Sequence, residues 1–147
     1  MQVFTVNNAS NFSTTSGSFV DISATALGAT LTPKSNTVTV HFHGALVQAA
    51  STPGSAIGWL DLIKDGVRVG GDDGICQFGG GDNGGTLSPI DAKTISFTRK
   101  VAVTPDTPTT IKLQWKCYAS AGSPTIYLLS GAGTSLGDTH PQFWIED

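Results

Sequence analysis

Apolar and polar residues alternate with a period of two along most of the chain, which is typical of β-strands that bury one face. The longest alternation covers residues 37–48, TVTVHFHGALVQ. It predicts a strand whose core face carries Val38, Val40, Phe42 and Leu46 and whose outer face carries Thr37, Thr39, His41 and His43. No stretch shows the period of 3.6 residues that an amphipathic helix requires. The chain is therefore predicted to be all-β.

Further strands are predicted at regular spacing, with turn residues between them. The clearest local pattern is in residues 57–69, IGWLDLIKDGVRV, where Asp65-Gly66 between two apolar runs predicts a tight hairpin turn. The other expected strands are residues 2–6, 19–27, a short one around 75–78, 93–103, 110–118, 125–129 and 142–146. With roughly eight or nine strands and no helix, we expect one domain over residues 1–147, an antiparallel β-sandwich or jelly roll.

Two of these strands have a well-defined inner face. In residues 110–118 the inward side chains are predicted to be Ile111, Leu113, Trp115 and Cys117, and the outward ones Lys112, Gln114 and Lys116. In residues 93–103 the predicted inward side chains are Ile95, Phe97, Val101 and Val103. Trp59 shares its parity with Asp61 and Ile63, and the pattern leaves its side of the sheet open.

Two segments interrupt the alternation. Residues 7–18, NNASNFSTTSGS, are polar and small, so we expect either a solvated loop or an arm that orders on a partner. Residues 70–85, GGDDGICQFGGGDNGG, are too rich in glycine for regular structure beyond the short strand, and they predict a long loop.

The composition argues against several classes of partner. Charged residues make up only 13% of the chain, the net charge is −3, and the basic residues are scattered and form no basic stripe. Nucleic acid and anionic membranes are therefore not expected partners. The first ten residues lack the pattern of a signal peptide, and no apolar run is long enough for a membrane-spanning helix, so we expect synthesis in a cytoplasm. Such a low charge also indicates a surface that other protein chains cover.

The histidines and cysteines form no complete metal-binding pattern. His41 and His43 share a strand face, as two metal ligands would, but the sequence offers only His140 and distant carboxylates to complete a site. Cys76 and Cys117 have no metal-ligand spacing, and in a reducing compartment we expect two free, buried or half-buried thiols. A disulfide between Cys76 and Cys117 is the alternative that the sequence leaves undecided.

The remaining candidate chemistry is sparse. The glycine-rich loop supplies oxygen ligands that fit no calcium-binding spacing; they are Asp72, Asp73, Asp82 and Asn83. No serine or cysteine lies in a nucleophile motif, and no pair of carboxylates is singled out by the sequence. We therefore predict that the protein is not an enzyme and needs no cofactor or metal.

Several stretches taken together resemble a known family. FVDIS (19–23), the Lys-Asp-Gly hairpin in WLDLIKDGVRVG (59–70), TIKLQWKCYASAG (110–122) and the acidic aromatic end QFWIED (142–147) are similar to the trimeric jelly-roll modules of the tumour-necrosis-factor and C1q type on bacteriophage surfaces. The similarity covers most of residues 19–147. It implies a non-enzymatic homotrimer that packs sheet faces and aromatic side chains around a threefold axis.

The resemblance implies one of two roles in a virion. The first is a capsid decoration protein, which binds threefold positions of the phage head beside the major capsid protein, stabilises the head, and lies on its outer surface. The alternative is the receptor-binding tip of a tail fibre, which recognises a cell-surface glycan or protein. Because the chain enters its first strand almost directly after Met1, without a shaft, we expect the decoration protein.

Three groups of residues are expected to make contacts. The trimer interface is expected to contain Thr39, His41, His43 and Trp59. Residues 1–18 are expected to act as a capsid-binding arm, through Gln2, Phe4, Asn8, Asn11 and Phe12. The ligand or partner loop is expected to use Asp72, Asp73, Phe78, Asp82 and Asn83.

Overall fold

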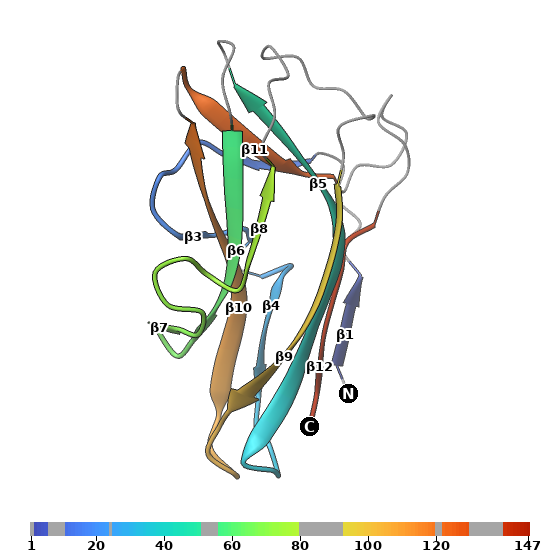
Figure 1. The fold of residues 1–147 in the computed structure, drawn as a ribbon. Helices are drawn as coiled ribbons and strands as arrows, with labels where there is room; N and C mark the ends of the chain where they lie inside the picture. Colours follow the sequence, from blue (N-terminus) through green and yellow to red (C-terminus); the bar gives the residue numbers. More distant parts are fainter. Residues whose placement is uncertain are drawn as a thin grey trace.

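The computed structural model describes residues 2–5, 11–23, 25–50, 56–79, 93–119, 122–129 and 140–147, and all the regular structure among them is strand (Figure 1). The strands are β1 (Gln2–Thr5), β2 (Phe12–Thr14), β3 (Val20–Asp21), β4 (Gly28–Leu31), β5 (Thr37–Ala50), β6 (Ala56–Lys64), β7 (Val67–Arg68), β8 (Cys76–Gly79), β9 (Lys93–Ala102), β10 (Thr109–Ala119), β11 (Pro124–Leu128) and β12 (Gln142–Glu146). Within these residues no helix has the length and apolar character needed to span a membrane.

The strands form two antiparallel sheets. The first sheet has the order β1-β12-β5-β11-β2, with β9 on the other side of β5. The second sheet has the order β3-β10-β6-β7, with β4 also on β10 and β8 also on β6. Figure 1 shows the two sheets as separate layers and the two chain ends side by side, since β1 pairs with β12. The fold is an antiparallel β-sandwich, as the alternation predicted.

The core lies between the sheets and comes from the predicted inner faces. The largest fully buried side chains from the two sheets include Phe42, Phe143 and Trp115. The predicted inward residues of β5 and β10 are all buried, namely Val38, Val40, Phe42, Leu46, Ile111, Leu113, Trp115 and Cys117. Ile95 and Phe97 of β9 are partly buried against this cluster. Burial of one large apolar side chain contributes about 2 kcal/mol to stability. The period-two pattern of these side chains therefore largely determines the fold.

The predicted hairpin joins β6 to β7. Asp65 and Gly66 both have positive φ, 48° and 85°, which is the backbone that a tight two-residue turn requires. The N–H of Thr110 donates to Asp65 Oδ1 at 2.7 Å, so the turn is also held to β10. This hairpin positions Arg68, which follows directly in β7.

Residues 19–27 were predicted as one strand, but of the described residues in this range only Val20–Asp21 form one, β3. Ser23 Oγ accepts the N–H of Ala26 at 3.0 Å, and this local bond makes a turn where a strand was expected. Leu113 of β10 bonds to both sides of the turn: its carbonyl accepts from Ile22, and its N–H donates to Leu27. The prediction failed because serine, threonine and alanine have short side chains that are accommodated in a turn as readily as in a strand.

The predicted polar loop or arm of residues 7–18 contains a strand. Residues 12–14 form β2, which pairs with Ile126–Leu128 of β11, and Phe12 packs against the core. One aromatic side chain among small polar residues is therefore enough to dock this segment on the first sheet.

Candidate functional site

The outer face of the first sheet carries three of the four residues predicted for the trimer interface. Thr39, His41 and His43 alternate along β5, and each lies between a residue of β12 and a residue of β9. The neighbours are Glu146 and Lys100 for Thr39, Trp144 and Thr98 for His41, and Gln142 and Ser96 for His43. We call this surface of β12, β5 and β9 the first face.

The imidazoles of the first face are held by cross-strand contacts. The His41 ring stacks on the Trp144 ring with 4.6 Å between centroids and 3° between planes. Its Nδ1 lies 3.0 Å from Thr98 Oγ1, and its Nε2 lies 3.4 Å from Glu146 Oε2. His43 Nδ1 lies 2.7 Å from Ser96 Oγ, while the His43 side chain stays exposed. The first face therefore combines short hydroxyl side chains, such as Ser96 and Thr98, with two imidazoles and the Trp144 ring.

The histidine pair does not belong to a larger cluster of metal ligands. Among the described residues, no group of three or more His, Cys, Asp or Glu side chains lies close enough to hold one ion. The polar neighbours of His41 and His43 on β9 are Thr98 and Ser96, whose hydroxyl groups take the imidazole nitrogens as hydrogen-bond partners.

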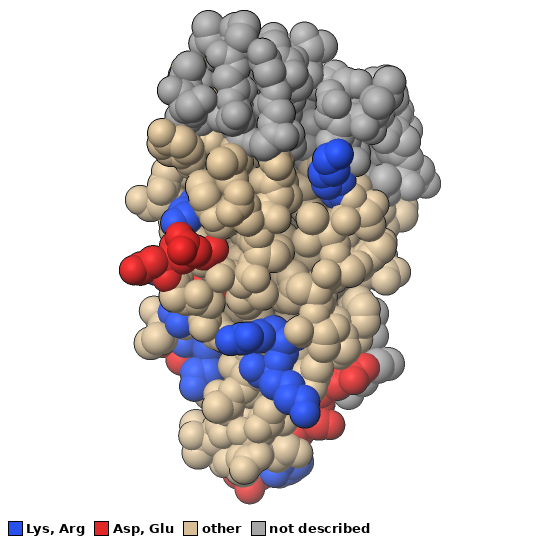
Figure 2. Space-filling view, viewed as in Figure 1, with Lys and Arg blue, Asp and Glu red and all other residues tan. Residues whose placement is uncertain are grey.

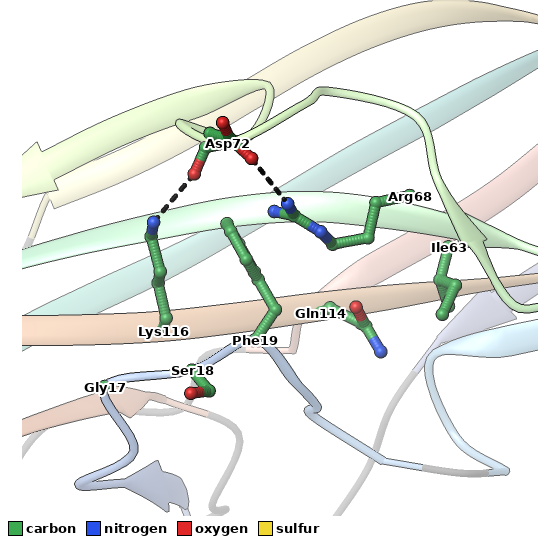
Figure 3. Close-up of a pocket in the computed structure, with 8 residues that line it drawn as sticks. All are labelled: Gly17, Ser18, Phe19, Ile63, Arg68, Asp72, Gln114 and Lys116. Atoms are coloured by element: carbon green, nitrogen blue, oxygen red, sulfur yellow. Dashed lines mark hydrogen bonds and ion pairs between the residues drawn. The ribbon is translucent and has the colours of Figure 1, made fainter.

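The outer face of the second sheet is built differently, around Phe19. The Arg68 guanidinium lies 4.5 Å and the Lys116 ammonium 4.7 Å from the centre of the Phe19 ring. Figure 3 shows the ring standing between these two cations, with Asp72 above it. Lys116 Nζ donates to the Asp72 carbonyl at 2.7 Å and lies 5.0 Å from the Trp59 ring centre. We call this surface of β10, β6 and β7 the second face.

A cavity of about 520 Å³ opens on the second face. Its lining comes from three parts of the chain: the segment before β3, the strands β6, β7 and β10, and the connection from β7 to β8. The polar groups that line it include Arg68, Asp72, Gln114 and Lys116. This volume is in the range of small-molecule sites.

A buried carboxylate anchors the loop that borders the cavity. Asp61 is 0% exposed although it belongs to the outward parity of β6. Its Oδ1 accepts the backbone N–H groups of Leu62 at 2.7 Å and Gly70 at 2.8 Å, and its Oδ2 lies 3.7 Å from Arg68 Nη1. A side chain at position 70 would overlap Asp61 Oδ1, so this contact requires Gly70.

The environment of Asp61 sets its pKa and the position of Arg68. Burial raises the pKa of the Asp61 carboxyl, and the two backbone N–H groups and Arg68 oppose that rise without cancelling it. Arg68 Nη2 also lies 3.3 Å from the exposed carboxylate of Asp72. Arg68 is thus held between an inner and an outer carboxylate.

A second acidic group on the same face behaves in the opposite way. Asp21 accepts from Gln114 Nε2 at 2.7 Å and from Lys112 Nζ at 2.9 Å. Partial burial alone would raise the pKa of Asp21, but these two hydrogen bonds and the Lys112 charge outweigh it, and the pKa is lowered. This network lies beside the cavity, because Gln114 also lines it.

Both cysteines are free thiols, Cys76 half-buried and Cys117 buried. Burial raises the pKa of Cys76 to about 11 and also raises that of Cys117. Such thiols are poor nucleophiles near neutral pH, because the thiolate is the reactive form.

The predicted partner loop is only partly on the surface. Asp72 and Asp73 are exposed, and Asp72 borders the cavity. The prediction for Phe78 is wrong, because this side chain is only 4% exposed and packs in the core. Its ring lies against Gly58, where a Cβ on residue 58 would overlap it. Phe78 was predicted for the partner loop as the one aromatic residue of segment 70–85, but β8 turns its side chain inward. Asp82 and Asn83 lie outside the described residues.

The residues predicted for the capsid-binding arm lie at two edges of the first sheet. Gln2 and Phe4 pair through the backbone with Ile145 and Phe143 of β12. Phe12 of β2 packs against the core, and the neighbouring Asn11 is half-buried. Asn8 lies outside the described residues.

The fourth residue predicted for the trimer interface lies apart from the other three. Trp59 is on the second face, next to Lys116, while Thr39, His41 and His43 are on the first. The sequence analysis also missed Phe19 and Arg68 as a pair, since Phe19 precedes β3 and Arg68 follows a hairpin. Only the outward parity of Lys116 and Gln114 indicated that polar groups would gather there.

No protein-family model matches the chain, and no curated protein is significantly similar to it. The solved structures that are similar in part include three named here. They are the insecticidal delta-endotoxin Cry8Ea1 from Bacillus thuringiensis (TM-score 0.44, 14% identity, 93% of this chain and 20% of that chain), dimeric latent PorU from Porphyromonas gingivalis (0.45, 11%, 99% and 12%), and the infectious bursal disease virus VP2 subviral particle (0.43, 16%, 99% and 36%). The chain thus spans between 12% and 36% of these proteins, and such similarity does not indicate what it binds.

Proposed function

We propose that the protein is a structural virion protein, a homotrimeric jelly-roll module of the tumour-necrosis-factor and C1q type that decorates a phage head. The strand order supports the jelly roll. The strands β1-β12-β5-β9 in one sheet and β4-β10-β6-β8 in the other follow the order of two interlocked Greek keys. The bacteriophage role comes from the sequence resemblance of the hairpin 59–70 and the acidic end 142–147.

The single observation that carries the proposal is the character of the first face. It spans β12, β5 and β9, and no described segment lies over it: His43, Ser96 and Thr98 are all exposed there. The exposed hydroxyl groups of Ser96 and Thr98 and the exposed imidazole of His43 offer hydrogen-bond partners to a symmetry-related copy. Three copies around one axis would cover this face in every subunit.

The low charge of the remaining surface is consistent with further cover by capsid protein. Figure 2 shows a wide uncharged area across the middle of the side it displays, with several blue side chains gathered below it. Among the described strands, β1 pairs only with β12, and a sheet edge of this kind can accept a strand from a neighbouring protein. A decoration protein acts by mass action, because binding the assembled head and not its free subunits stabilises the assembled state.

A tail-fibre tip is the second candidate, and the cavity on the second face supports it. In the proposed trimer the first face is turned inward and the second outward, so the cavity would stay open to a ligand. Its volume of about 520 Å³ suits a small polar group on a cell surface.

Electron cryomicroscopy of undecorated heads mixed with the purified protein tests the decoration role. We expect density at the threefold positions. We also expect decorated heads to resist disassembly by heat or low salt better than undecorated heads. If the heads stay bare at saturating protein and the protein binds host cells, the decoration role is wrong and the fibre-tip role is favoured.

A further inference from the structure

We propose that the cavity on the second face is a binding site for the carboxylate of an acidic saccharide, with Arg68 and Lys116 as the groups that hold it. The inference goes beyond the structural role proposed above and does not depend on it, because the site lies within one subunit. Figure 3 shows both cations directed toward Asp72, which lies above Phe19.

The two cations are fixed before any ligand arrives. Phe19 separates them, with its ring centre 4.5 Å from Arg68 and 4.7 Å from Lys116. Asp61, fully buried, faces Arg68 Nη1 at 3.7 Å and holds the inner side of the guanidinium. Attraction between a cation and an aromatic face also limits the movement of both side chains. A ligand therefore meets a preorganised pair, which lowers the entropy cost of binding.

The side chain of Asp72 marks the position of the ligand carboxylate. Its Oδ1 lies 3.3 Å from Arg68 Nη2, and the Asp72 carboxylate is fully exposed to solvent. An exposed ion pair of this kind contributes little, so water or another carboxylate displaces it readily. The Lys116 ammonium donates to the Asp72 backbone carbonyl, and within the described part of the chain it forms no ion pair with a carboxylate. An incoming carboxylate replaces the Asp72 side chain on Arg68 and gains Lys116.

The rest of the lining fits a sugar ring rather than a bare anion. The cavity has room for about one small saccharide unit, and Gln114 and Ser18 place amide and hydroxyl groups at its border. Ile63 adds an apolar patch against which the C–H groups of a sugar can pack. The combination of hydrogen-bonding groups, a small apolar contact and a fixed cation pair is what a sugar acid requires.

The experiment compares D-glucuronate with D-glucose by NMR titration of the full chain. The two sugars share a ring and differ in the carboxylate. We expect glucuronate to shift the Phe19 ring and Arg68 side-chain signals, with at least tenfold tighter binding than glucose. Equal binding of the two sugars, or glucuronate shifts confined to other surfaces, would overturn the proposal.

Three variants give the test its specificity. Lys116→Gln is expected to weaken glucuronate binding about tenfold, whereas Asp72→Ala is expected to strengthen it a few-fold by removing the internal competitor. Lys34→Gln is the matched control, because Lys34 pairs with Asp106 away from the cavity, and it should leave affinity within twofold. Weaker binding in Asp72→Ala would contradict the displacement of Asp72.

A short acidic peptide distinguishes the source of the carboxylate. Acetyl-Gly-Glu-Gly-amide carries the same group without a sugar ring, and we expect it to bind at least tenfold more weakly than glucuronate. If the peptide binds as tightly as the sugar acid, the saccharide assignment is wrong. Intact unfolding transitions of each variant show that lost binding is not lost folding.

Discussion

The two outer faces of the sandwich satisfy their polar groups in different ways. On the first face, His41 and His43 bond to hydroxyl groups on the neighbouring strand, and His43 remains exposed. On the second face, Asp61 is sealed by the connection from β7 to β8 and holds it in place. The chain thus completes the second face by itself, while the first face has a uniform strip of polar groups without cover from the described residues. A surface of the first kind suits self-association, and one of the second kind suits a small ligand.

The largest effect is expected from Asp61→Ala, which breaks the second face. The change leaves the N–H groups of Leu62 and Gly70 without their acceptor and removes the inner partner of Arg68. Unsatisfied buried groups of this kind cost about 3 kcal/mol in total. Urea unfolding at fixed protein concentration measures the loss.

Two controls accompany this variant. Asp61→Asn keeps an oxygen acceptor and should recover much of the lost stability. His43→Ala, at an outward position of the first face, should change the free energy of unfolding by less than about 0.5 kcal/mol per chain in the dissociated protein. If Asp61→Ala lowers the free energy of unfolding as little as His43→Ala does, the proposed difference between the two faces is wrong.

Cys76 tests how well the second sheet is closed from its inner side. With its pKa at about 11, we expect alkylation at pH 8 to be about two orders of magnitude slower than that of a free cysteine. Mass spectrometry after timed iodoacetamide treatment measures this, with urea-unfolded protein as the reference. Rapid modification of folded protein would show that β8 does not cover this thiol.

The paired change His41→Ala and His43→Ala sharpens the account of the first face. Both imidazoles would meet a symmetry mate in the proposed trimer, so we expect about a tenfold weaker association, or about 1.4 kcal/mol. Sedimentation equilibrium gives the association constant. Elemental analysis of the untagged wild-type protein is the companion measurement: stoichiometric zinc or nickel would turn the histidine pair into a metal site.

The smallest effect is a pH dependence that separates two carboxylates of the second face. The folded pKa of Asp61 is raised, so the folded state binds its proton more tightly, and stability falls as the pH rises from about 3.8 through the raised value. The folded pKa of Asp21 is lowered, so its contribution is present above 3.8 and is lost as the pH falls through the lowered value. Unfolding curves of Asp61→Asn and Asp21→Asn should flatten these two windows separately. A shared window for both variants would contradict the opposite shifts.

The strands with strong alternation were predictable, and those with weak side-chain character were not. Residues 37–48 and 110–118 have apolar side chains at most inward positions, with Gly44 as an exception, so their faces follow from sequence alone. Residues 19–27 contain serine, alanine and threonine, whose short side chains fit a turn as readily as a strand, and the bond from Ala26 to Ser23 decided the outcome.

The candidate sites were less predictable because they depend on contacts distant in sequence. The first face could be assigned from the parity of β5 alone. The second face could not, since Phe19, Arg68 and Lys116 come together only after β10 pairs with both β3 and β6. Phe78 failed for a related reason: its position in the core depends on the space that Gly58 leaves on the neighbouring strand.

One matched pair of variants tests the central claim that the first face is the self-association surface. Ser96→Glu adds a negative charge beside His43, and Gln77→Glu adds the same charge at an exposed outward position of the second sheet. By sedimentation at micromolar concentration, we expect about 46 kDa, three times the 15.2 kDa chain, for wild type and Gln77→Glu, and 15.2 kDa for Ser96→Glu. A monomeric wild type, or a Ser96→Glu variant that stays trimeric, would contradict the account.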